Sequence, residues 1–507
     1  MSAQTHIGRL TWRKRLAWLA GLVAALAIVV SVLNLERDRT GLSISSRSVG
    51  TTPATLYRLP GGQGPLVIVA HGFAGSRQLM QAYSLTLAQA GYTVLAFDFE
   101  GHGRNPVPMS GDVTAIDGTT ALLVGETRRV IAAGRERIPK ASGVALLGHS
   151  MATDILIRAA IAEREDGTPV DAIVAISMFS GAVTAKQPKR LLAISGEWET
   201  RLREVALADL QMLQEGAREG ETAAADGVTR RAVVAPGVEH VGVLFSATAL
   251  REARAWLDAT FERSSEGQIA LPGLWILLLM AGIVGLFKPL TGLLPETARP
   301  PARVSAQRFW ASVLIPAVAV PLVAVTLYIP FLPVLVADYL MIHLALYGIA
   351  QLVLLRAWKM DGAAFSGPAV LLLVIWGTAV FGLAMDRYAA SFMATGERLA
   401  IIATLAVGTV PFMIADAFVT GAGRGPWWRR AAARIAVLLS LGGAAALDPE
   451  RLMFIFLILP VLVLFYLVHG LMGRWIARRS GPLSAGLGLG LCLAWALGVS
   501  FPLFSPG

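Results

Sequence analysis

The sequence predicts two structural parts: a domain with a mostly parallel β-sheet and helices on both faces, and an all-α bundle of membrane-spanning helices. Short apolar segments alternate with stretches of helical period between residues 36 and 268, which is typical of parallel sheets with crossover helices. Long apolar runs then follow one another from residue 269 to 507. Each is close to the ~20 residues that a spanning helix needs. A further apolar run, residues 16–35, precedes the sheet domain.

The composition limits the class of protein. The 507 residues are 55% hydrophobic and 15% charged, and the mean hydropathy of +0.61 is too high for a purely soluble protein. The net charge of +10 comes mostly from short segments between apolar runs, which indicates membrane orientation and no nucleic-acid partner. The single cysteine, Cys492, excludes an intrachain disulfide and a cysteine metal cluster. With no ligand cluster visible, we expect neither a metal nor an organic cofactor.

The first apolar run predicts a retained membrane anchor. Residues 1–15 carry four basic side chains, and residues 16–35 carry no charge. A cleavable signal peptide would end at an A-x-A-like site, and this run continues to Glu36 without one. Because basic flanks stay in the cytoplasm, residues 1–15 are predicted to be cytoplasmic and residues 36–268 extracytoplasmic.

The second half predicts about eight further membrane helices, which brings the total to about nine. The apolar runs are residues 269–287, 309–329, 338–355, 367–385, 399–420, 431–447, 452–472 and 482–503. Every second connection should be basic if the first helix runs outward. These connections carry Lys288, Arg299, Arg303 and Arg308; Arg356 and Lys359; Arg424, Arg429, Arg430 and Arg434; and Arg474, Arg478 and Arg479. The pattern predicts an integral protein of a bacterial inner (plasma) membrane with its C-terminus outside.

A sharp turn between a strand and a helix stands out in the sheet domain. The apolar segment 144–147 meets a helical pattern through Gly148, His149, Ser150, Met151 and Ala152. Such a G-x-S-x-small turn exposes its serine at the tip of a strand, and the small residues at its ends let strand and helix approach closely. Ala152 stands where glycine is usual. Further strands are expected at residues 54–59, 65–70, 91–98, 171–177, 190–196 and 228–234, with helices at 117–136 and 247–261.

Several short motifs follow these strands in a fixed order. They are His71-Gly72-Phe73, Asp98 with Gly101-His102-Gly103, the Ser150 turn, Gly196-Glu197-Trp198-Glu199 and His240. This order resembles the α/β-hydrolase superfamily, and particularly its dienelactone-hydrolase-like and serine aminopeptidase/monoacylglycerol-lipase-like branches. The resemblance covers residues 50–262. It implies an α/β-hydrolase fold for the sheet domain and an enzymatic activity.

The resemblance also implies roles for individual residues. Ser150 would be the nucleophile, His240 its general base and Glu199 the acid that orients His240, with Glu197 as the alternative acid. The backbone N–H groups of Phe73 and Met151 would form the oxyanion hole. Supporting positions are His71, Gly72, Gly148 and Asp98, whereas His102 and His149 are expected to be structural.

The connection between the strands at 171–177 and 190–196 is too short for the helical lid that many relatives carry. Residues 178–189 provide only a short loop, so we expect no large lid, and the bilayer surface or the outer rim of the bundle should shape the acyl pocket. The rim charges are interpreted as exposed loop charges, with a docking surface for the sheet domain or a lipid headgroup as the alternative. They are Asp338, His343, Asp386, Arg387, Glu397, Arg398, Asp448, Glu450 and Arg451.

These observations predict a membrane-bound serine hydrolase that acts on carboxylic esters, such as lipid or amphiphilic acyl esters, through a Ser150 acyl-enzyme. Its partners would be the ester substrate and membrane lipids. One alternative is a membrane acyltransferase that moves an acyl group to a lipid or glycan hydroxyl. Another is a transporter or receptor with a degenerate hydrolase domain. The sequence leaves the acyl group, the leaving group and the oligomeric state open.

Overall fold

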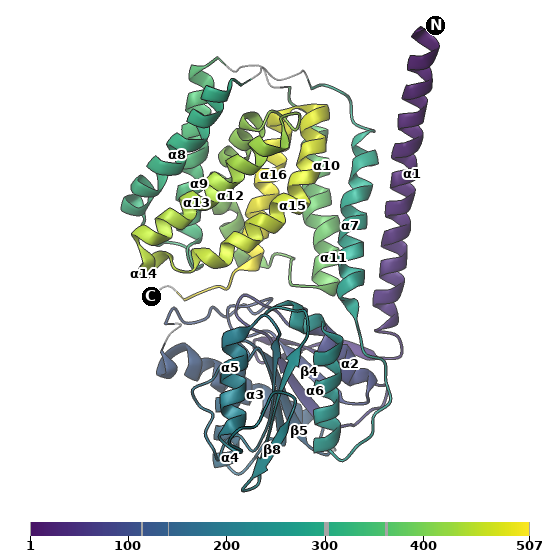
Figure 1. Ribbon diagram of the computed structural model, residues 1–507, viewed down its shortest axis with the longest axis vertical. Helices are drawn as coiled ribbons and strands as arrows, with labels where there is room; N and C mark the ends of the chain where they lie inside the picture. The colour runs from purple at the N-terminus through teal and green to yellow at the C-terminus, as the bar shows by residue number, and fades with distance from the viewer. Residues whose placement is uncertain (1, 113–114, 140, 299–303, 360–363, 506–507) are drawn as a thin grey trace.

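The computed structural model describes residues 2–112, 115–139, 141–298, 304–359 and 364–505, and Figure 1 shows a sheet domain below a bundle of helices. The chain begins with α1 (Ser2–Arg37), which extends beyond the predicted anchor at both ends. Helix α1 runs beside α7 (Pro272–Thr291), the first helix after the sheet domain (Figure 1). A side-chain Cβ at Gly282 of α7 would lie 2.9 Å from Ile28, so glycine permits this close helix contact.

The sheet has nine strands in the order β1-β2-β4-β3-β5-β6-β7-β9-β8. The six strands from β4 to β9 in this order are parallel, whereas β1, β2 and β8 pair antiparallel with their neighbours at the two edges. The prediction of a mostly parallel sheet is therefore confirmed. The strands are β1 (Ser43–Val49), β2 (Thr52–Arg58), β3 (Leu66–Ala70), β4 (Thr93–Phe97), β5 (Val144–His149), β6 (Ala172–Ile176), β7 (Arg190–Gly196), β8 (Thr222–Ala225) and β9 (Val228–Ala235).

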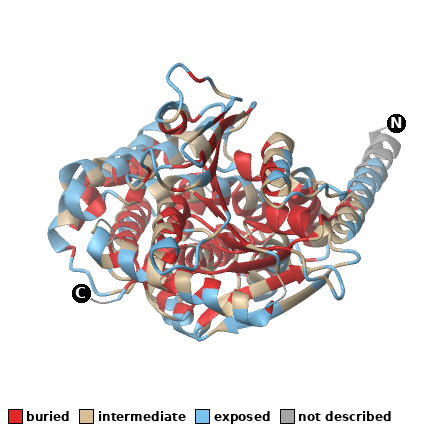
Figure 2. Cartoon of the chain, turned by 90° about the horizontal axis from the view of Figure 1, so that it is seen from below, coloured by how far each residue is buried: buried red, intermediate tan, exposed pale blue. Residues whose placement is uncertain are grey.

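Helices cover both faces of the sheet. Helices α2 (Gln81–Gln89) and α6 (Ala247–Thr260) lie on one face, and α3 (Ala121–Arg137), α4 (Met151–Glu165) and α5 (Thr200–Gln211) lie on the other (Figure 1). Alternate residues of the buried strand β3 point to opposite faces, so Ile68 joins the core under α3 and α4, and Val69 joins the core under α2 and α6. Figure 2 shows the strands of the sheet as a buried layer between the helices.

The bundle follows the predicted apolar runs. Its helices are α7, α8 (Ala306–Leu327), α9 (Ala337–Ala357), α10 (Gly367–Val374), α11 (Phe381–Tyr388), α12 (Gly396–Val419), α13 (Trp427–Leu447), α14 (Pro449–Leu452), α15 (Ile455–Ser480) and α16 (Pro482–Ser500). A π-helical turn, Ile375–Val380, joins α10 and α11 into one long helix. Within the described residues, nine helices including α1 are long and apolar enough to cross a membrane. Arg299 and Arg303 of the predicted basic connections lie outside the described residues.

The loops after β3 and β4 contact the bundle. The Leu503 N–H donates to the Gly101 carbonyl (2.8 Å), and the Met109 N–H donates to the Leu503 carbonyl (2.9 Å). The Ser391 N–H of the α11–α12 connection donates to the Ser76 hydroxyl (3.0 Å). Because these loops leave the C-terminal ends of parallel strands, this edge of the sheet faces the bundle.

The two covalent links between the sheet domain and the helices both contact Gln89 at the end of α2. Its side-chain amide donates to the carbonyls of Asp38 (3.2 Å) and Thr40 (3.1 Å) in the link from α1. In the link to α7, Gly267 packs against the Gln89 carbonyl, which would lie 2.9 Å from a Cβ at that position. The domain is therefore joined to the helices at one corner.

The interpretation of the rim charges as exposed loop charges is wrong for several residues. Asp338 and His343 are 1% and 0% exposed, and Arg398 is 2% exposed. The Arg398 guanidinium donates to the carbonyls of Phe501 (2.7 Å) and Gly498 (3.0 Å) and also contacts that of Gly101 (3.3 Å). Asp338 likewise pairs with backbone groups, the N–H groups of Phe331 and Leu332, whereas the His343 ring contacts the hydroxyls of Tyr339 and Ser440. Two more join the helices to each other or to the sheet domain: Asp386 pairs with Arg104, and Arg387 with Glu36.

Candidate active site

Ser150 occupies the sharp turn between β5 and α4. Its backbone has φ 52° and ψ −120°, a conformation that few non-glycine residues adopt and that a surrounding structure must hold. The Ser150 N–H donates to the Ile176 carbonyl (2.9 Å), which fixes the turn against β6. A Cβ at Gly148 would lie 2.6 Å from Leu156 and 3.0 Å from the Cβ of Ala152. Small residues at both positions therefore let the helix begin directly over the strand.

Three side chains from distant parts of the chain form one hydrogen-bonded row. The His240 Nε2 lies 2.9 Å from the Ser150 Oγ, and the His240 Nδ1 lies 2.6 Å from the Glu199 Oε1. Ser150, Glu199 and His240 follow β5, β7 and β9, and the C-terminal ends of these parallel strands meet at one edge. Since an ionised carboxylate only accepts hydrogen bonds, Nδ1 carries the imidazole proton, and Nε2 is free to accept from the serine hydroxyl.

The Glu199 carboxylate is held by three donors. Besides His240, the Gly196 N–H (2.6 Å) and the Ser177 hydroxyl (2.8 Å) donate to its Oε2. Burial alone would raise the pKa of Glu199, but these hydrogen bonds outweigh it and hold the pKa below its ordinary value of 4.5. The group is thus ionised at neutral pH.

Glu197, the alternative acid, has a different environment. Its side chain is exposed, and its Oε2 accepts from the Gly237 N–H (2.6 Å) in the neighbouring loop. The structure therefore brings Glu199, and not Glu197, to His240. Ser177 is a site residue that the sequence analysis missed, although its position directly after β6, between the Ser150 and Glu199 strands, could have indicated it.

The loop after β3 approaches the serine closely. A Cβ at Gly72 would lie 3.0 Å from the Ser150 Cβ and 3.1 Å from the His149 Nδ1, so a larger residue would push the loop away. Phe73 follows directly, and Met151 opens α4, whose first N–H groups have no acceptor within the helix. These are the two residues whose N–H groups were predicted to bind an oxyanion.

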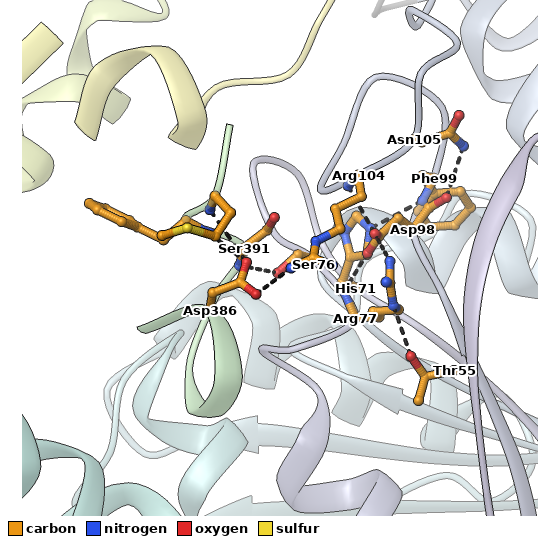
Figure 3. A network of polar contacts seen from close by, with 12 residues as sticks. Thr55, His71, Ser76, Arg77, Asp98, Phe99, Arg104, Asn105, Asp386 and Ser391 are labelled. Atoms are coloured by element: carbon orange, nitrogen blue, oxygen red, sulfur yellow. Dashed lines mark hydrogen bonds and ion pairs between the residues drawn. The ribbon is translucent and has the colours of Figure 1, made fainter. Parts of the chain in front are cut away.

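His71 stabilises this loop through two hydrogen bonds of its ring. Its Nδ1 donates to the Gly72 carbonyl (2.8 Å), and its Nε2 accepts from the Phe99 N–H (3.2 Å), so the ring ties the loop after β3 to the loop after β4. Complete burial lowers the pKa of His71 to about 4, and the ring is neutral. Asp98 fixes the same pair of loops: it accepts from the Arg77 N–H (2.7 Å) and the Arg104 N–H (3.0 Å) and pairs with the Arg77 guanidinium (Figure 3).

The other two histidines contact the site without joining the row. The His149 Nε2 donates to the His240 carbonyl (2.8 Å), and the two rings lie 4.7 Å apart, so His149 supports the loop that carries His240. Burial lowers the pKa of His149 to about 4. His102 packs between the rings of His71 (5.2 Å) and Phe73 (5.5 Å).

The Ser150 region matches a known family. Residues 63–249 match the family described as serine aminopeptidase, S33, which is a little over a third of the chain. The strand order and the turn at Ser150 agree with this match, and the sheet domain has the α/β-hydrolase fold. Among the described residues, no group of three or more His, Cys, Asp or Glu side chains is arranged to hold a metal ion.

Curated relatives match short segments. An epoxide hydrolase from Caballeronia sordidicola is 28% identical over 92 residues, which are 18% of this chain and 28% of that protein. An uncharacterized protein of Mycobacterium tuberculosis is 39% identical over 61 residues, which are 12% of this chain and 22% of that protein. The chain thus spans about a quarter of the length of these relatives.

Several solved structures are similar to part of this chain. A dienelactone hydrolase from Anabaena variabilis covers 44% of this chain with 98% of its own length, at 19% identity and a TM-score of 0.32. A hormone-sensitive lipase from a metagenome library covers 52% with 99% of its length, at 14% identity and a TM-score of 0.32. A bacterial membrane phospholipase A covers 51% with 99% of its length, at 15% identity and a TM-score of 0.31.

Proposed function

We propose that the protein is a membrane-bound serine hydrolase of carboxylic esters in which Ser150 is the nucleophile, His240 the general base and Glu199 the orienting acid. The observation that carries the proposal is the continuous row from the Ser150 Oγ through both His240 nitrogens to Glu199, at 2.9 and 2.6 Å. A hydroxyl is a weak nucleophile until a base takes its proton, and an ionised acid fixes the tautomer of that base.

The chemistry then follows in two halves. The Ser150 Oγ attacks the ester carbonyl carbon while His240 Nε2 takes the hydroxyl proton, and the N–H groups of Phe73 and Met151 stabilise the oxyanion. The bond to the alkoxy group breaks, and the imidazolium returns the proton to the leaving alcohol. Water next attacks the carbonyl carbon of the Ser150 acyl ester while His240 Nε2 takes its proton. The bond to the Ser150 Oγ then breaks, the imidazolium returns the proton to that oxygen, and the carboxylic acid leaves.

Solvent access favours hydrolysis over acyl transfer. The His240 side chain is 44% exposed, so water can reach the imidazole that would activate it. The acyltransferase alternative requires water to be excluded from the acyl-enzyme, and it predicts an acylated acceptor when a donor ester and a hydroxyl acceptor are supplied together. The other alternative, a transporter or receptor with a degenerate hydrolase domain, is disfavoured because the hydrogen-bonded row of Ser150, His240 and Glu199 is intact.

We further propose that the nine apolar helices cross a bacterial inner membrane, with the N-terminus cytoplasmic and the sheet domain and C-terminus extracytoplasmic. The support is the alternation of basic and non-basic connections in the sequence. Protease added to intact spheroplasts checks this orientation, since it should cleave an extracytoplasmic domain without lysis.

The proposed activity is tested with a fluorophosphonate probe, which reacts with an activated serine. Purified full-length protein should be labelled and should hydrolyse p-nitrophenyl acetate, and Ser150→Ala should do neither. If the wild type labels no better than Ser150→Ala, Ser150 is not an activated nucleophile and the proposal fails.

A further inference from the structure

A small apolar pocket lies between the sheet domain and the bundle. The sheet domain contributes Phe73, and the bundle contributes Val336 at the start of α9, Phe454 and Leu457 at the start of α15, and Phe504 in the segment after α16. Residues from three separate parts of the bundle therefore converge on one side chain of the sheet domain.

The pocket adjoins Ser150 through Phe73. A Cβ at Gly72, directly before it, would lie 3.0 Å from the Ser150 Cβ, and the Phe73 ring lies 5.9 Å from the Phe454 ring and 6.5 Å from the Phe504 ring. One residue thus offers its backbone N–H to the proposed oxyanion hole and its side chain to the pocket. If a substrate carbonyl binds at Ser150, an apolar group attached to it would lie next to Phe73. The pocket is on the other side of Phe73, toward the bundle.

Two further observations point to a binding role. Val336 has φ 54°, and a β-branched residue in this left-handed region is strained in a way that clusters at ligand sites. Exposed apolar side chains also stand next to lining residues in the sequence: Met453, before Phe454, is 52% exposed, and Phe456, before Leu457, is 56% exposed. They provide an apolar approach from the side of the bundle.

We propose that this pocket, whose free volume of about 10 Å³ has room for one methyl-sized group, receives the end of the aliphatic acyl chain of an ester that resides in the membrane, so that the bundle supplies one wall of the acyl-binding site. The inference rests on the proposed function and names the substrate class of that site. It also accounts for the short β6–β7 connection, because the sheet domain itself carries no lid there to cover an acyl chain.

The test is the chain-length profile of full-length protein in detergent. The quantity compared is kcat/KM for p-nitrophenyl octanoate divided by that for p-nitrophenyl acetate, with active sites counted by fluorophosphonate labelling. Each methylene that enters an apolar pocket contributes about fourfold, so Leu457→Trp, which fills the pocket, should lower this ratio about fourfold or more. Leu457→Ala, which enlarges the pocket, should shift the preference toward decanoate and longer chains.

Leu467→Trp is the matched control, because it makes the same change on the same helix at a position 66% exposed on the outside of α15. It should keep the wild-type ratio. If Leu457→Trp and Leu457→Ala also keep the wild-type ratio while acetate and octanoate are both hydrolysed, the pocket proposal fails and the proposed function stands. If the wild type hydrolyses no ester and is not labelled, the proposed function fails, and the pocket proposal falls with it.

Discussion

Glu199→Gln tests the proposed role of Glu199 most directly, because its effect can be worked out atom by atom. The Gly196 N–H can only donate, so the amide oxygen of the glutamine must occupy the Oε2 position beside it, where the Ser177 hydroxyl also donates in the native protein. The amide NH₂ then faces the His240 Nδ1. The amide donates there, which makes Nδ1 an acceptor and moves the imidazole proton to Nε2.

An imidazole with its proton on Nε2 cannot take the proton of the Ser150 hydroxyl. The geometry would remain intact, yet kcat should fall about 10³- to 10⁴-fold, the loss that the equivalent acid-to-amide change produces in a serine protease. A 10⁴-fold loss corresponds to about 5.5 kcal/mol of transition-state stabilisation. The assay is steady-state hydrolysis of p-nitrophenyl acetate, normalised to folded protein by size-exclusion chromatography.

Glu197→Gln is the matched control, since it makes the same chemical change two residues away. Its carboxylate accepts from the Gly237 N–H, a bond that a glutamine oxygen can keep, so kcat should stay within about twofold of wild type. The reasoning is refuted if Glu199→Gln retains more than about a tenth of the wild-type kcat, or if Glu197→Gln causes the larger loss.

Three other perturbations have expected outcomes. Ser177→Ala removes one donor to the ionised Glu199, and a hydrogen bond to a charged group contributes about 1.5 kcal/mol, so kcat should fall about tenfold in the same ester assay. Burial raises the pKa of Glu126 from 4.5 to about 7; the native state therefore binds more protons than the unfolded state between these values, and stability falls as pH rises through them. Thermal unfolding should show wild type losing up to about 3 kcal/mol from pH 4.5 to 8, a loss that Glu126→Gln lacks. Arg398→Met strips donors from buried carbonyls and should destabilise the protein by about 3 kcal/mol, whereas Arg47→Met on the surface should change the unfolding temperature little; an equal effect of the two would contradict a structural role for Arg398.

Local patterns predicted most of the fold because the inner elements bury one face or both. The continuous apolar runs of β3, β5 and β6 have no other stable place than the centre of a sheet, and each long apolar run of the second half matches a helix. The edge strands were missed for the converse reason. Strand β1 (SISSRSV) is polar and exposed, and β8 (TAAA) is short, so neither carries the apolar signal that a buried strand must have.

The candidate site also has a part that the sequence predicted and a part that it could not predict. Ser150, Glu199 and His240 were predicted from the resemblance of their motifs to the α/β-hydrolase superfamily, and the structure brings them together because each follows a parallel strand that ends at the same edge of the sheet. The contacts of Ser391, Arg398 and Leu503 with the loops of the sheet domain could not be predicted, because nothing in a local pattern tells which of many loops at a helix end will dock. Arg398 illustrates the difficulty: a charge beside a predicted span looks exposed until the segment that buries it is placed.

The two chain links that meet at Gln89 have a mechanical consequence. Covalent connections at a single corner form a pivot, and a rigid body on one pivot can swing unless it is held elsewhere. Part of the restraint comes from segment 501–505, whose backbone pairs with Gly101 and Met109 beside the loop that carries Phe73, and part from the Ser76–Ser391 and Arg104–Asp386 contacts. Any rotation of the sheet domain away from the bundle would have to separate these contacts, and the same movement would pull Phe73 from Phe454 and Phe504.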